Sequence, residues 1–100
     1  MGSRKIAIFY ETAEGHTRSV AERMRDTLAE AGHDARVVRC RDAAPGDIDE
    51  ADAVIVGSSI HAGKHDKKTL RFARENAAAL AARPSAYFSV NLTARSEKEA

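Results

Sequence analysis

Two short apolar runs dominate the hydrophobic pattern of the chain, residues 5–10 (Lys-Ile-Ala-Ile-Phe-Tyr) and residues 53–57 (Ala-Val-Ile-Val-Gly). Runs without polar alternation are typical of strands that are buried on both faces, as in a parallel sheet. Two weaker segments predict further strands: residues 35–38, which end in two valines, and residues 85–91, which contain two aromatic residues and a valine. The pattern therefore predicts four strands.

Apolar residues recur at helical spacing in two places between these strands. The first helix is expected from Thr17 to a stop at Gly32, and the second from an N-cap at Asp66 to the break before Pro84. The expected inward positions are Val20, Ala21, Met24, Leu28 and Ala31 in the first helix, and Leu70, Ala73, Ala77 and Leu80 in the second. Residues 41–52 are mostly polar and contain Pro45-Gly46, so we expect a loop with a single helical turn there.

Strands and helices thus alternate along the chain, which predicts an α/β fold with a parallel sheet and right-handed crossovers. Ligands of such open sheets bind beyond the carboxyl ends of the strands. Three loops are expected at that edge, residues 11–17, 57–65 and 91–95, and they are rich in Thr, Ser, Gly and Asn. The chemistry of the protein is therefore expected in these loops.

Composition narrows the class of protein. The 100 residues are 43% hydrophobic and 31% charged, which fits one globular domain over residues 1–100 and excludes a disordered chain. A net charge of +1 disfavours a strong nucleic-acid binder. The single cysteine, Cys40, permits no internal disulfide and is expected to be a small, partly buried apolar residue. With neither a signal peptide nor a membrane-spanning run in view, we expect a cytoplasmic location.

The first loop has the chemistry of a phosphate site. Thr12, Gly15 and Thr17 stand just before a helix, whose free N–H groups and partial positive charge attract phosphate. Glu11 and Glu14 count against this interpretation unless they point outward. Spacing alone supports simple helix capping as well as phosphate binding.

The second loop follows a buried strand and carries residues that could flank a flat ring: Gly57, Ser58, Ser59, Ile60, His61 and Gly63. Taken alone, an ordinary connection between strand and helix is the favoured interpretation. A metal site at His61 and His65 is disfavoured, because Gly63 opposes the helix that would bring the two rings to one face. No side chain stands out as a catalytic acid, base or nucleophile.

Three segments resemble a known family. Residues 9–18, with Thr12, Gly15 and Thr17, are similar to the FMN-phosphate loop of flavodoxins. Residues 54–60 with Gly63, and above all residues 84–95, are similar to one flavodoxin-like subgroup, the menaquinone-dependent protoporphyrinogen dehydrogenases of bacterial haem synthesis. The resemblance implies a flavodoxin-like three-layer sheet with strand order 2-1-3-4. Because members of the family continue with a fifth strand and a last helix, the sheet is expected to be incomplete.

The resemblance also implies a cofactor and a reaction. FMN would be held without a covalent bond, its phosphate by Thr12, Ala13, Glu14, Gly15, His16 and Thr17, and its ring by Ser58, Ser59, Ile60, His61, Ala62, Gly63, Asn91, Leu92, Thr93 and Ala94. Full-length members would oxidise protoporphyrinogen IX to protoporphyrin IX, with a quinone as electron acceptor and with peripheral contact to the inner face of the plasma membrane.

Two other functions stay open. An electron-transfer flavodoxin would bind FMN without a reaction of its own, although the near-neutral charge fits it less well. A non-catalytic fragment that associates with itself is the other alternative. Its basis is the fourth strand, whose open edge predicts a homo-oligomer.

Overall fold

The structure, a computed structural model, describes residues 4–11, 16–61, 64–65 and 67–91 of the chain. Its elements are β1 (Lys5–Glu11), α1 (His16–Glu30), β2 (Asp34–Arg39), the 3-10 turn η1 (Cys40–Asp42), α2 (Pro45–Asp49), β3 (Ala53–His61), β4 (Lys64–His65), α3 (Lys67–Glu75), α4 (Ala77–Ala81) and β5 (Ser85–Asn91). The expected alternation of strands and helices is confirmed, and α2 is the single helical turn expected between the second and third strands.

The four main strands form a parallel sheet in the order β2-β1-β3-β5. Because β5 is the fourth long strand along the chain, the expected order 2-1-3-4 is confirmed. The two-residue strand β4 pairs antiparallel with the end of β3. It lies on the β1 side of β3, since β5 already occupies the other side at the same residues.

The expectation of a loop directly after residue 57 is wrong. β3 runs on to His61, and β4 turns back along it. The polar residues Ser58 and Ser59 remain in the strand because β5 pairs with them, through Ser89 and Val90. Hydrogen bonds from a neighbouring strand therefore outweigh the weak strand preference of this stretch.

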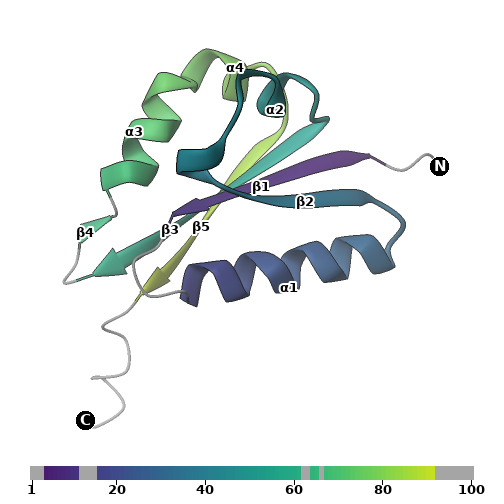
Figure 1. Cartoon of the computed structure of the whole chain (residues 1–100), viewed down its shortest axis with the longest axis horizontal. Coiled ribbons are helices and arrows are strands. Elements are labelled where there is room, and N and C mark those ends of the chain that lie inside the picture. Colours follow the sequence, from purple (N-terminus) through teal and green to yellow (C-terminus); the bar gives the residue numbers. More distant parts are fainter. Residues whose placement is uncertain (1–3, 12–15, 62–63, 66, 92–100) are drawn as a thin grey trace, which may run out of the picture.

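Helices cover the sheet on both faces: α1 lies on one face, and α2, α3 and α4 lie on the other (Figure 1). Strand β1 contributes to the hydrophobic core on each face of the sheet, because successive side chains of a strand point to opposite faces. Ile8 and Tyr10 pack with Ala21 of α1, whereas Phe9 packs on the opposite face. There its ring meets Phe72 of α3 with 4.8 Å between ring centroids.

In the second helical segment the inward positions expected at Ala73 and Leu80 are confirmed, and those expected at Leu70 and Ala77 are wrong. Leu70 is 47% exposed and Ala77 is exposed, whereas Thr69 and Phe72 are buried beside the sheet. The large ring of Phe72 takes the core position opposite Phe9 and is buried where the expectation placed Leu70. The segment also breaks at Asn76, which separates α3 from α4 and donates from Nδ2 to the carbonyl of Phe72. The N-cap expected at Asp66 lies outside the described residues.

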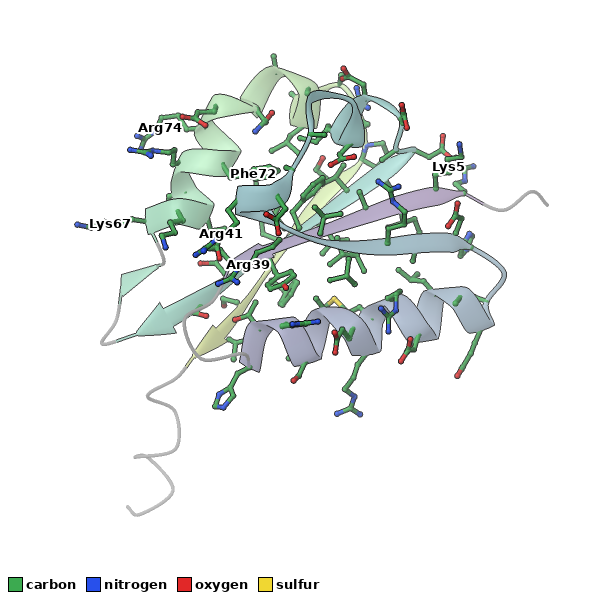
Figure 2. All side chains as sticks on the ribbon, viewed as in Figure 1. Lys5, Arg39, Arg41, Lys67, Phe72 and Arg74 are labelled. Carbon is green, nitrogen blue, oxygen red and sulfur yellow. The ribbon has the colours of Figure 1, made fainter. Side chains whose placement is uncertain are left out.

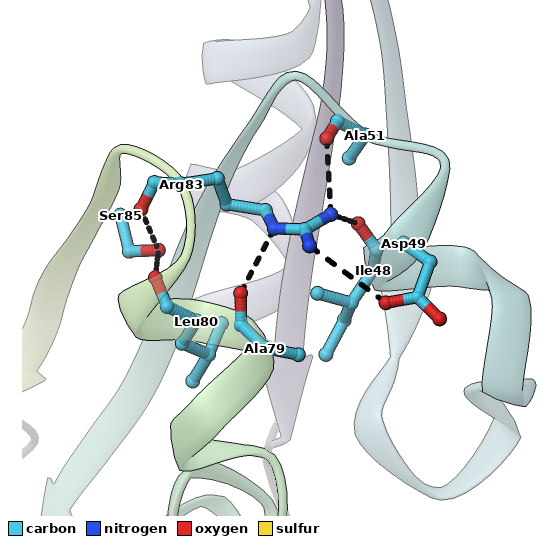
Figure 3. Close-up of polar contacts among 7 residues, drawn as sticks. All are labelled: Ile48, Asp49, Ala51, Ala79, Leu80, Arg83 and Ser85. Atoms are coloured by element: carbon cyan, nitrogen blue, oxygen red, sulfur yellow. Dashed lines mark hydrogen bonds and ion pairs between the residues drawn. The ribbon is translucent and has the colours of Figure 1, made fainter.

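Arg83, between α4 and β5, ties α4 to α2 (Figure 3). Its guanidinium donates to the carbonyl of Ala79 at 2.8 Å and to the carbonyls of Ile48 and Ala51, which lie at and after the end of α2. An ion pair with Asp49 completes the contact. The carbonyl of Ile48 also accepts from the backbone N–H of Ala51 at 3.0 Å, so Arg83 adds a second donor to it.

Candidate functional site

The carboxyl edge of the sheet brings the expected site segments together. Glu11, the last residue of β1, pairs in register with Ser58 of β3, and Ile60 pairs with Asn91, the last residue of β5. Helix α1 begins at His16 beside this edge (Figure 1). The start of α1 and the ends of β3 and β5 are therefore one neighbourhood, as the sequence predicted.

A buried hydrogen bond joins α1 to β3. Oγ1 of Thr17 and Oγ of Ser59 are 2.7 Å apart, and both residues are buried, at 0% and 5% exposure. This bond fixes the first turn of α1 against the far end of β3. The start of α1 and the end of β3 are consequently held together, with the partial positive charge of the α1 N-terminus at this edge of the sheet.

β3 and β5 approach each other closely at Gly57. Phe88 pairs in register with Gly57, and its ring lies where the Cβ of any larger residue at position 57 would stand. Ser58, the next residue, is buried, and its hydroxyl donates to the carbonyl of Ser59 at 3.2 Å. A glycine is thus required at position 57 by the aromatic ring that crosses it.

Many of the expected cofactor residues lie outside the described part of the chain: Thr12, Ala13, Glu14, Gly15, Ala62, Gly63, Leu92, Thr93 and Ala94. His16, Ile60, His61 and Asn91 lie in described elements at the edge, and the side chain of His16 is exposed. Among the expected residues with described side chains, Thr17 and Ser59 are buried together, and Ser58 is buried on the α3 side of the sheet. Their roles in binding remain predictions.

Glu11 carries a feature that the sequence did not indicate. Its side chain is neither directed outward nor near α1: it is 1% exposed and accepts a 2.7 Å hydrogen bond from Nε of Arg39. Arg41 adds an ion pair of 3.5 Å between its Nε and Oε2 of Glu11 (Figure 2). Burial opposes ionisation, but the hydrogen bond and charge of Arg39, with Arg41, lower the pKa of Glu11 below its ordinary value.

The negative charge of Glu11 therefore does not oppose the binding of a phosphate near the start of α1. Side chains alternate along β1, so Glu11 lies on the α3 face of the sheet together with Phe9. Its charge is compensated there by two arginines from the end of β2 and from η1. The signal in the sequence was the pair Arg39 and Arg41, which follow the strand that neighbours β1.

Three further structural findings bear on the class of protein. The described residues contain no group of three or more His, Cys, Asp or Glu side chains that could hold a metal ion. Cys40 is buried in the core of the α3 face, more fully than expected. In the described part of the chain, no helix is long and apolar enough to cross a membrane.

A sequence model of the flavodoxin domain matches residues 7–100 of the chain. The chain belongs to this flavodoxin family. The flavodoxin domain is also similar to protoporphyrinogen IX dehydrogenase (quinone) from Leishmania major, at 34% identity over 98 residues, and from Escherichia coli, at 33% identity over 91 residues. It spans 41% and 50% of the length of these two relatives, while 93% and 91% of this chain is matched.

Solved structures confirm the fold. A flavodoxin from the domain Archaea superposes with a TM-score of 0.74 at 22% identity, over 95% of this chain and 73% of that chain. A Fusobacterium nucleatum flavodoxin bound to flavin mononucleotide superposes with a TM-score of 0.71 at 11% identity, over 90% of this chain and 53% of that chain. Rubredoxin oxygen:oxidoreductase from Desulfovibrio gigas contains the same fold, with a TM-score of 0.76 at 19% identity over 90% of this chain and 24% of that chain.

Proposed function

We propose that this flavodoxin domain binds FMN at the carboxyl edge of its sheet, with the phosphate at the start of α1. The observation that carries the proposal is the buried hydrogen bond between Thr17 and Ser59. It holds the positive end of α1 against the end of β3, where a phosphate and the ring attached to it need adjacent sites. The donor set fits the group: a hydroxyl, the N–H groups of the first helical turn, and no uncompensated carboxylate from Glu11.

Within this proposal the chain holds the cofactor, and FMN, when bound, supplies the redox chemistry. The backbone N–H groups of residues 12–17 donate to the phosphate, and segments 58–63 and 91–94 flank the ring. Thr17 orients the first helical turn, and Gly57 lets Phe88 close the gap between β3 and β5 beneath the site. No described side chain takes the role of a catalytic acid or base.

The proposed reaction is oxidation of protoporphyrinogen IX to protoporphyrin IX with a quinone as acceptor. Its support is the similarity to two protoporphyrinogen IX dehydrogenases, which extends over 93% and 91% of this chain. A quinone dissolved in a membrane requires contact with that membrane, so we propose a cytoplasmic domain that touches its surface peripherally.

Titration of FMN with the purified domain tests cofactor binding, because FMN fluorescence and absorption change on binding. We expect Thr17→Ala to weaken FMN binding about tenfold, the effect of one hydrogen bond to a charged group or to its support. Thr27→Ala, an exposed threonine on the same helix, is the matched control and should bind as the wild type does. Equal FMN affinity of Thr17→Ala and wild type would remove Thr17 from the site.

The reaction is tested separately with the FMN-loaded domain. Protoporphyrin fluorescence should appear when protoporphyrinogen IX and a soluble quinone are added, faster than in the same mixture with free FMN. FMN binding without this acceleration would favour an electron-transfer flavodoxin. Absence of FMN binding would contradict both functions.

A further inference from the structure

A second pocket lies on the face of the sheet opposite α1. It has a volume of about 450 Å³ and is bounded by η1, the end of β1 and one side of α3. Cys40 and Phe72 form its apolar floor, and both belong to the buried core. The start of α1 lies on the other face of the sheet (Figure 1). The pocket shares no lining residue with the proposed FMN site and is therefore distinct from it.

Three basic side chains line this pocket. Arg41 of η1 lies on one side, and Lys68 and Arg71 lie on the facing side of α3. Lys68 and Arg71 are three residues apart and so share one stripe of the helix with Phe72. Glu75 continues that stripe at the end of the pocket and is the acidic residue that α3 contributes.

The other acidic residue of the lining, Glu11, is already compensated. Its Oε1 accepts the short hydrogen bond from Arg39, and its Oε2 is buried without a hydrogen-bond partner among the described residues. Arg41 is 3.5 Å from Oε2, and its side chain is half exposed. Arg41 makes this ion pair through Nε and can keep it while its two terminal nitrogens bind a ligand, and no described residue forms an ion pair with Arg71.

We propose that this pocket binds a small polyanion, a molecule with at least two carboxylate or phosphate groups. Arg41 from η1 and Arg71 from α3 both line the pocket, and a guanidinium group can bind a carboxylate or phosphate through two parallel N–H donors. The apolar floor of Phe72 and Cys40 keeps water away from one side, which strengthens the attraction between the charges. A volume of about 450 Å³ is that of a site for a small metabolite.

Titration with two probes tests the proposal and distinguishes the two sources of charge. Citrate supplies carboxylates and inorganic pyrophosphate supplies phosphates, each added at constant ionic strength to the FMN-free domain and to the FMN-saturated domain. We expect saturable binding of at least one probe in both forms. Backbone amide signals of residues 40–42 and 68–75 should shift, while those of the first turn of α1 should not.

Matched variants of α3 distinguish binding in this pocket from nonspecific attraction of anions to basic side chains. Arg71→Ala should weaken binding about tenfold, the loss of one charge-assisted pair of hydrogen bonds. Lys67→Ala and Arg74→Ala are the controls, because these two cations point away from the pocket (Figure 2) and should leave the affinity unchanged. Arg71 is exposed, so its replacement should not alter the melting temperature.

Three results would overturn the proposal: no saturable binding of either probe, equal weakening by Arg71→Ala and Arg74→Ala, or competition of FMN with the probe. The last would mean that the anion occupies the α1 site instead. Because binding is measured with and without FMN, a failure of the proposed FMN site leaves the test of this pocket intact.

Discussion

Gly57 shows how one missing side chain determines the contact between two strands. The Phe88 ring occupies the space of a Cβ at this position. We expect Gly57→Ala to lower the free energy of unfolding by about 2–3 kcal/mol, the cost of forcing an extra carbon into a packed contact. Urea unfolding measures this loss. In a Phe88→Ala background the same substitution should cost much less, and additive effects of the two changes would contradict the overlap.

Glu11 makes stability depend on pH. Its pKa is lower in the folded chain than the ordinary 4.5, so the ionised form stabilises the fold above that pH. The stabilisation should be complete near pH 7 and should be lost as pH falls below about 4.5 toward the folded pKa. We expect Glu11→Gln to lower the free energy of unfolding by about 1–3 kcal/mol at neutral pH, and by less in acid.

Urea unfolding of wild type and Glu11→Gln across the pH range measures this difference. Glu22→Gln is the comparison, because Glu22 forms an exposed ion pair with Arg18 and should change stability by less than about 1 kcal/mol. A Glu11→Gln difference that stays constant from neutral to acid pH would show that ionisation of Glu11 is not the cause.

At the scale of elements, Arg83 joins α2 to α4 by hydrogen bonds to three carbonyls. Arg83→Lys keeps the charge but cannot reproduce the planar fork, so we expect a loss of about 1–3 kcal/mol in the free energy of unfolding. The contact lies near residues 48–51, which precede β3, whereas the FMN site is proposed at the opposite edge of the sheet. FMN affinity of the folded variant should therefore stay unchanged. A loss of FMN affinity without a loss of stability would contradict this separation.

The elements that the sequence predicted well are those in which one local pattern dominates. The apolar runs of β1 and β3 and the helical spacing of α1 need no partner to be recognised. The extension of β3 through Ser58 and Ser59 was missed because its cause is the pairing with β5. The burial of Phe72 instead of Leu70 was missed because its cause is the packing of Phe72 against Phe9, a contact between residues far apart in the chain.

One part of the candidate site was also predictable from the sequence, and another part was not. The neighbourhood of Thr17 and Ser59 was predictable, because parallel strands place their carboxyl ends at one edge. The compensation of Glu11 was not predictable from β1 alone, since Arg39 and Arg41 come from the neighbouring strand and the turn after it. Charged residues at the ends of adjacent parallel strands are thus better evaluated as pairs than one by one.

The described strands form a sheet with two outer edges, β2 and β5, and the edge at β5 is the one that lies beside an exposed aromatic side chain. No described strand pairs with the outer side of β5, so its backbone N–H and C=O groups there have no partner strand. Tyr87 on this strand is 63% exposed, and beside it a groove of about 220 Å³ is lined by Leu70 and Ala73 of α3. An unpaired strand next to an apolar groove favours association with a strand from another molecule.

We expect a second copy of the chain to cover this edge, with two β5 strands pairing about a two-fold axis. A net charge of +1 provides little repulsion between copies. Light scattering from micromolar to millimolar protein should therefore show a mass that rises toward that of two chains. Ser89→Lys places an exposed charge on the edge strand and should keep the domain monomeric. Arg74→Lys is the control, because it leaves the charge of α3 unchanged, and it should not prevent association. A mass of one chain at every concentration would show that something other than a second copy protects β5.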